Sequence, residues 1–275
     1  MDIDIRRGLS EAWALAGDHW RTLLAYTVLG VAVPSLLLAS EPIFSLRNIM
    51  AIAADPWTYR VSGSIAGPLY LLAIVAAIVG GTMLAAWNAI LSPMREGYLS
   101  EIMYGMVAGV AFLLASMSIN LAVGFGLATI IWFAIGMEQW LAMPLAVQVI
   151  ARIIGWTLTS WLGARLWLAG PIMGERGKLG PLSAFAESWR ATRAAQVRLF
   201  GLYFAFNMTA GALVGLLVVL HGYLIMNGAP GSTGETLMGG AWLVFWSAWF
   251  VAIILLPAGL YRAAQPAAAA AEVFA

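Results

Sequence analysis

The sequence alternates long apolar runs with short polar segments. A helix that crosses a hydrocarbon core of ~30 Å needs about 20 residues, whereas a membrane strand needs only about 10 alternating ones, so the length of these runs favours helices. Six runs reach that length, at residues 21–40, 68–92, 105–133, 148–171, 198–225 and 240–261. The pattern therefore predicts an all-α, polytopic membrane bundle with six transmembrane helices.

The third and fourth runs follow one another with little interruption. Residues 105–171 are apolar almost throughout, and the segment "GMEQW" at 136–140 is their clearest break. We expect a turn there, because Glu138 would be costly to leave in lipid. All six spans belong to one domain, residues 1–262, and a low-complexity tail follows at 263–275.

Short amphipathic segments precede some of the spans. In residues 181–197, Leu182, Phe185 and Trp189 recur at helical spacing. The charged residues at other positions of this helix are Glu187, Arg190 and Arg193. An apolar face with tryptophan, opposite an arginine-rich face, is typical of a helix that lies in the membrane interface. Such a helix either only anchors the topology or also binds lipid headgroups or a partner.

Three stretches of the chain resemble one another. They are "LSEAWALAGDHW" from Leu9, "LSEIMYGMVAGV" from Leu99 and "FAESWRATRAAQ" from Phe185, and they align Glu11, Glu101 and Glu187. The second, fourth and sixth runs also end alike, with Pro93, Pro171 and Pro257 each followed by an arginine. The sequence thus indicates a threefold repeat of about 90 residues, in which a short leading helix precedes a span out, an outer loop and a span back. The middle copy shows the weakest similarity.

The composition supports a membrane location. The chain has 275 residues, of which 62% are apolar and 10% are charged, whereas a soluble domain is about half apolar and about a quarter charged. The net charge of +1 provides no field for binding nucleic acid. The absence of cysteine excludes disulfides and thiolate catalysis. Abundant alanine and a strong preference for arginine over lysine favour a high-GC bacterial source, so we expect the bacterial inner membrane.

The basic residues predict the orientation. One side of the predicted bundle, which includes both termini, has ten of them: Arg6, Arg7, Arg21, Arg95, Arg176, Lys178, Arg190, Arg193, Arg198 and Arg262. The other side has only Arg47 and Arg60. Because basic loops remain in the cytoplasm, we expect both termini there. The start "MDIDIRRGLSEAW" mixes acids with bases and is not predicted to be a signal peptide.

Signals for catalysis are few. The two histidines, His19 and His221, are predicted on opposite membrane faces, so they cannot share a metal. No motif pairs a nucleophile with a base, and none binds a nucleotide. We therefore expect no catalytic residue, cofactor or metal site.

Arg165 is the least expected charge, because it lies within the fourth apolar run, six residues before Pro171. A charge at the centre of a membrane helix costs ~2.5–3.5 kcal/mol, which is tolerated when the side chain faces the bundle and finds polar partners. We predict that Arg165 points inward and pairs with a glutamate of a leading helix, first Glu187 and otherwise Glu11 or Glu101.

Several of these residues resemble a known family. The span end "RLWLAGP", then Glu175, "GPLSAFAESWRATR" and "RLFGL" are similar to a bacterial family of six-span proteins. The family includes the membrane domain found beside glycerophosphodiester phosphodiesterases and relatives of unknown function. In the two-part enzymes a separate soluble barrel carries the metal ligands, and this chain has no such barrel. The resemblance therefore implies a fold and a membrane address, and no enzymatic activity.

The leading hypothesis for function is a non-enzymatic membrane protein that organises or regulates lipid or a partner protein at the cytoplasmic leaflet. The alternative is a transporter or carrier of a small or lipidic substrate, which would need a polar cavity at midplane. A membrane-embedded enzyme ranks third. Small-residue pairs at 105–109 and 211–215 serve either internal packing or homo-oligomerisation. The expected partners are thus membrane lipids, a membrane protein or a second copy of the chain.

Overall fold

The computed structural model describes most of the chain. The described residues are 3–41, 44, 45, 48, 66–92, 99, 103, 105–111, 114, 115, 118, 145–176, 180–228 and 232–265. Within these residues all regular secondary structure is helical. Most of the predicted third span, together with Glu101, Glu138 and all but the start of the tail, lies outside them.

The first span is built from three consecutive helical segments. These are α2 (Trp20–Thr27), the π-helical turn η1 (Val28–Ala32) and α3 (Val33–Ala39), and α1 (Ile5–Asp18) precedes them. Pro34 explains the change of helix type, because proline has no N–H to give the preceding turn. A π-helical turn is a common way to accommodate such an interruption.

The remaining helices follow in chain order. They are α5 (Ala66–Leu91), α8 (Leu145–Leu166), α9 (Ala169–Arg176), α10 (Pro181–Ala191), α11 (Gln196–Asn227) and α12 (Thr233–Ala264). In the described part, four helical stretches are long and apolar enough to cross a membrane: Trp20–Ala39, Tyr70–Leu91, Gln196–Asn227 and Thr233–Ala264. They coincide with the first, second, fifth and sixth predicted spans and indicate a membrane protein.

The helix in the fourth predicted span ends before Pro171. That span was expected to continue to Pro171, but α8 ends at Leu166 and α9 begins at Ala169. Proline cannot donate to the carbonyl four residues earlier, and its ring crowds that carbonyl, which favours an interruption near residue 167, although α12 continues through Pro257. Pro171 instead lies in the first turn of α9, where a missing N–H costs little.

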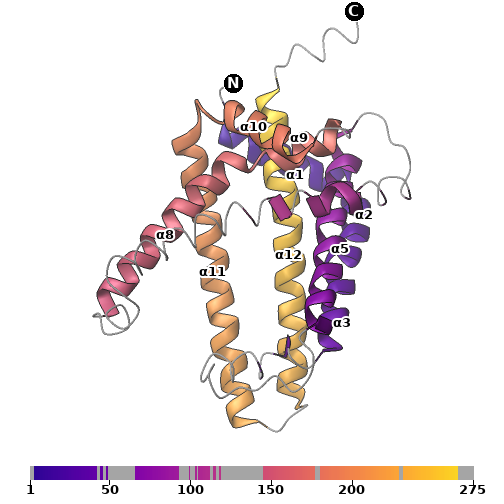
Figure 1. The fold of residues 1–275 in the computed structure, drawn as a ribbon, viewed down its shortest axis with the longest axis vertical. Helices are drawn as coiled ribbons and strands as arrows, with labels where there is room; N and C mark the ends of the chain where they lie inside the picture. The colour runs from indigo at the N-terminus through magenta and orange to yellow at the C-terminus, as the bar shows by residue number, and fades with distance from the viewer. Residues whose placement is uncertain are drawn as a thin grey trace, which may run out of the picture.

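The long helices run alongside one another, and the short ones lie across one end (Figure 1). α5, α11, α12 and the α2–α3 rod form the bundle, while α8 slants away from it. We call the end formed by α1, α9 and α10, with the start of α11 and the end of α12, the polar end. Both the first described helix and the last one reach it, so the described chain begins and ends on one side.

Trp87 joins three helices close to the polar end. It lies in α5, is only 3% exposed, and donates its indole N–H to the carbonyl of Ile254 in α12 at 3.0 Å. Its ring lies directly against Gly170 of α9, and its Cβ and backbone lie against Gly174, so a Cβ atom on either glycine would overlap Trp87. The two glycines therefore allow α9 to approach α5 closely.

A second close approach fixes the first helix to the last. The buried residues of α1 are Gly8, Ala12 and Leu15, which share one face of the helix. A Cβ atom on Gly259 of α12 would overlap the carbonyl of Gly8 and would lie 2.5 Å from the backbone nitrogen of Ala12. The α1–α12 contact thus depends on backbone atoms meeting without side chains between them.

Two of the predicted repeat units have the same order of elements. In the first, α1 leads into the α2–α3 rod and α5, and in the third, α10 leads into α11 and α12. α1 packs on α12, and α10 packs on α9 and α8, so each leading helix contacts the helix that ends another unit. The middle unit falls largely outside the described residues, and the threefold repeat stays a prediction.

The close contact at Gly259 predicts a sharp difference between two glycine substitutions. Gly259→Ala should lower the free energy of unfolding by about 1–3 kcal/mol, since the added methyl group overlaps backbone atoms of α1. Gly215→Ala in α11 is the matched control, because its Cβ atom would meet nothing within 4 Å. The control should leave stability unchanged or raise it by up to about 1 kcal/mol. Thermal melting in detergent measures both, and equal melting temperatures would contradict the contact.

Candidate functional site

Arg165 is buried at the polar end, where α8 meets α10. Its side chain is 3% exposed. One terminal nitrogen, Nη2, donates to the backbone carbonyl of Trp189 at 2.5 Å. The guanidinium carbon lies 4.4 Å from the centroid of the Trp189 ring, a cation–π geometry. Arg165 thus faces inward, as predicted, and it contacts α10 through Trp189.

The backbone of Arg165 is also bound by α10. Because α8 ends one residue later, the carbonyl of Arg165 has no partner within its own helix. The hydroxyl of Ser188 donates to it at 2.8 Å, and Thr192 Oγ1 lies 3.3 Å from it while also bonding the carbonyl of Ser188 at 2.8 Å. Both hydroxyl residues are fully buried, so α10 caps the end of α8.

The first predicted partner of Arg165, Glu187, is wrong, and Glu101 lies outside the described residues. Glu187 turns to Arg176 instead, and the Nε and Nη1 atoms of Arg165 are buried without a hydrogen-bond acceptor among the described residues. A buried donor left in this state costs about 1–3 kcal/mol, and more when the group is charged. This is the largest unmet polar demand in the described part of the chain, and sequence alone did not reveal it.

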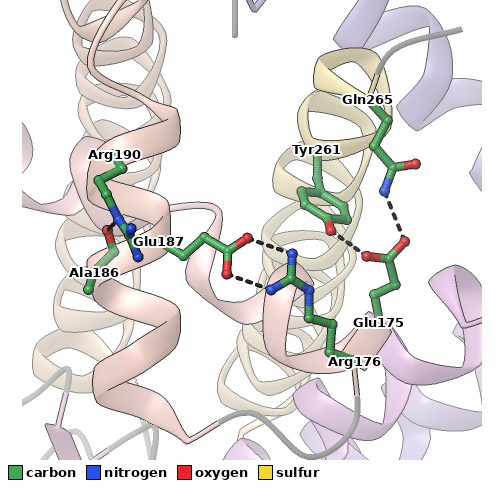
Figure 2. Close-up of polar contacts among 7 residues, drawn as sticks. All are labelled: Glu175, Arg176, Ala186, Glu187, Arg190, Tyr261 and Gln265. Carbon is green, nitrogen blue, oxygen red and sulfur yellow. Dashed lines mark hydrogen bonds and ion pairs between the residues drawn. The ribbon is translucent and has the colours of Figure 1, made fainter. Parts of the chain in front are cut away.

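Arg176 and Glu187 form a two-bond ion pair between α9 and α10 (Figure 2). Nη1 donates to Oε2 at 2.7 Å, and Nη2 donates to Oε1 at 2.6 Å. The side chains are 49% and 30% exposed, so solvent screens their attraction. The fork geometry nevertheless fixes the direction in which α10 leaves α9.

The neighbouring Glu175 points to a different helix. Figure 2 shows its carboxylate beside the end of α12, where the Tyr261 hydroxyl and the Gln265 amide both donate to it, the amide at 2.9 Å. Adjacent residues of α9 thus carry opposite charges to opposite sides. Two further contacts close this corner: Asn88 donates to the carbonyl of Gly174 at 2.8 Å, and Arg262 to that of Ile90 at 3.4 Å.

The other predicted site residues that the structure describes form no hydrogen bond or ion pair with Glu175, Arg176 or Glu187. Glu11 stays on α1, with its carboxylate 4.0 Å from Arg7, and Glu101 lies outside the described residues. Arg190 donates back to the carbonyl of Ala186 on its own helix at 3.3 Å (Figure 2). Arg193 is exposed, and its charge acts repulsively on Arg165.

The polar end exposes large apolar side chains beside its arginines. Trp13 on α1 is 83% exposed and Leu182 on α10 is 76% exposed. Arg6 and Arg190 are exposed on the same two helices. A surface that presents tryptophan and leucine together with arginine suits the boundary between lipid headgroups and acyl chains.

A cavity lies at the opposite end of the bundle. It has a volume of about 860 Å³ and is bounded mainly by α3, α11 and α12. Its lining is largely apolar, with Leu36, Trp242 and Trp246 among the larger side chains. Trp242 donates its indole N–H to His221 at 3.1 Å, so this histidine serves as an acceptor within the wall.

The described residues contain no group of histidine, aspartate and glutamate side chains that could hold a metal ion. No protein-family model, curated protein or solved structure matches the chain. What the molecule does must therefore be argued from its own residues.

The sequence did not single out several residues that build the site. Ser188 and Thr192 follow Ala184 at intervals of four, so small buried side chains share one face of α10. That spacing was a usable signal for close contact with another helix. The sequence around Tyr261 and Trp87 gave no such signal. Their hydrogen-bond partners, Glu175 and Ile254, lie on helices far away in the sequence.

Charge reversal tests the pair that joins α9 to α10. Arg176→Glu and Glu187→Arg should each speed hydrogen exchange in residues 181–191 by about fivefold, since like charges replace an attraction of about 1 kcal/mol. The double variant restores opposite charges and should return exchange toward the original rate. Exchange measured by mass spectrometry in detergent checks this, and a double variant as fast as the single ones would show that the pair does not hold α10.

Proposed function

We propose that the protein is a non-enzymatic, six-span protein of the bacterial inner membrane whose polar end binds anionic lipid headgroups of the cytoplasmic leaflet. Through that contact it organises or regulates lipid, or a partner protein, at this surface. The observation that carries the proposal is the pairing of exposed Trp13 and Leu182 with exposed arginines on α1 and α10.

The geometry of the polar end favours a lipid surface over water. Large exposed apolar side chains lose favourable burial in water, and at the interface they regain it. Each arginine near an anionic leaflet adds about 1 kcal/mol of attraction. The helices are also held in place, because α1 packs closely on α12 and α10 is bound to α8 and α9. A fixed pair of interfacial helices suits a sustained contact with headgroups.

The six-span arrangement remains part of the proposal. Four candidate spans support it, and α8 lies where a fourth consecutive span is expected. The shared order of elements in the first and third units supports three equivalent units. The resemblance to six-span proteins found beside glycerophosphodiester phosphodiesterases points to the same architecture.

The cavity at the other end favours a second candidate, a carrier of a lipidic substrate. A mostly apolar cavity of about 860 Å³ has the size of a ligand site. Its polar groups are few, and His221 is already bonded to Trp242. We rank this function second, because Glu235 is the one charged residue among the described residues that line the cavity, and most of the described charged residues gather at the polar end.

The orientation predicts which side each reporter reaches. A fluorescent protein that folds only in the cytoplasm should be active when fused after Ala275. The same reporter inserted between α11 and α12, at residues 229–231, should be inactive, whereas alkaline phosphatase at the same position, which needs the periplasm, should be active. The opposite pattern at the two sites would overturn the proposed orientation.

Anionic lipid should stabilise the protein through the exposed arginines. In nanodiscs, replacing zwitterionic with anionic lipid should raise the melting temperature, and added salt should reduce the gain. Arg6→Gln combined with Arg190→Gln should remove about 2 kcal/mol of the stabilisation by anionic lipid, because each arginine contributes about 1 kcal/mol, and the melting temperature should rise less. Arg60→Gln, from the predicted opposite side, is the matched control and should keep the full stabilisation. A melting temperature independent of lipid charge would refute the proposal.

A further inference from the structure

The unmet hydrogen bonds of Arg165 point to a missing acceptor. A guanidinium carries five N–H donors, and the only acceptor that the described residues provide is the Trp189 carbonyl. Buried charged donors without acceptors are rare in stable proteins, and the usual explanation is a group that binds there. From this we infer that Arg165, Trp189 and Arg193 form a binding site for a phosphate group.

Arg193 supplies a second positive charge at this site. It lies four residues after Trp189, in the turn that follows α10, and is exposed. Among the described residues its side chain forms no hydrogen bond or ion pair, and its charge repels that of Arg165. The nearest acid along the helix, Glu187, is bound to Arg176 by both oxygens. An anion between the two arginines would replace their repulsion with two attractions.

Phosphate fits this arrangement better than a carboxylate. Its oxygens are arranged tetrahedrally, so one group can accept from two guanidinium groups in different planes. The site also lies at the polar end. Its place among phospholipid headgroups, which carry a phosphate, rests on the proposed function. The same chemistry could come from a phospholipid or from free phosphate, and the experiment must separate the two.

Trp189 controls access to the buried nitrogens. Its ring covers the guanidinium, is 37% exposed, and contacts the edge of Trp161 at a centroid distance of 5.3 Å. The backbone of α10 is held separately, by Ser188 and Thr192 on the Arg165 carbonyl. A movement of the Trp189 side chain can therefore uncover Arg165 while α10 stays in place.

Binding is measured on the purified full chain in detergent, by thermal shift and native mass spectrometry. The probes are dihexanoyl phosphatidylglycerol, dihexanoylglycerol, which lacks the phosphate, and inorganic phosphate against chloride at equal ionic strength. We expect one phosphatidylglycerol per chain, retained in high salt, and no retention of dihexanoylglycerol. If inorganic phosphate binds and phosphatidylglycerol does not, the ligand is free phosphate. If phosphatidylglycerol binds and inorganic phosphate does not, the ligand is a lipid headgroup.

Two substitutions and one control locate the site. Arg165→Gln should weaken binding at least about tenfold, the loss expected for charge-assisted hydrogen bonds. Arg193→Gln should weaken it about threefold, and because Arg193 is exposed this variant remains informative if Arg165→Gln fails to fold. Arg21→Gln removes the same charge from an exposed residue of α2 that lies against Trp20, and this variant should bind as the original chain does.

The result separates this inference from the proposed function. Binding that is unchanged in Arg165→Gln and Arg193→Gln, or equal for dihexanoylglycerol, overturns the phosphate site, even if anionic nanodiscs stabilise the protein through Arg6 and Arg190. Loss of that nanodisc effect, with a salt-resistant phosphate still bound at Arg165, overturns the proposed function and leaves the site intact.

Discussion

Helix ends leave backbone carbonyls without partners, and the polar end is assembled around that constraint. A carbonyl near a lipid environment must find a donor within the protein, since water is scarce there. Here side chains of other helices provide it. The donors are Ser188 and Thr192 for Arg165, Asn88 for Gly174, Arg262 for Ile90, Arg165 for Trp189 and Trp87 for Ile254.

These bonds explain why the short helices stay attached to the bundle. Four of the bonded carbonyls lie in the last turns of α5, α8, α9 and α10, and that of Ile254 lies just before Pro257 inside α12. Because each donor lies in a helix other than that of its acceptor, the end of one helix fixes the position of another. The exposed ion pair of Arg176 and Glu187 adds direction to a framework that buried bonds already hold.

The hydropathy pattern predicted the membrane helices and the inward direction of Arg165. It did not predict the contacts that depend on where each helix ends. Four apolar runs became helices long enough to cross a membrane, since run length alone decides that property. The inward direction of Arg165 also followed from the cost of a charge in lipid. Its partner did not follow, because the choice between Glu187 and the Trp189 carbonyl depends on where α8 stops. Pro171 marked the start of α9 rather than the end of a span, and sequence spacing does not distinguish those two uses of proline.

The contact between α1 and α12 links the first described helix to the last one, so it joins the described helices that lie farthest apart in the sequence. During synthesis, the face of α1 formed by Gly8, Ala12 and Leu15 cannot pack on α12 until Thr233–Ala264 has emerged from the ribosome. The other helices are complete by then. The polar end is therefore completed last, and a chain truncated before α12 would lack the helix on which α1 packs.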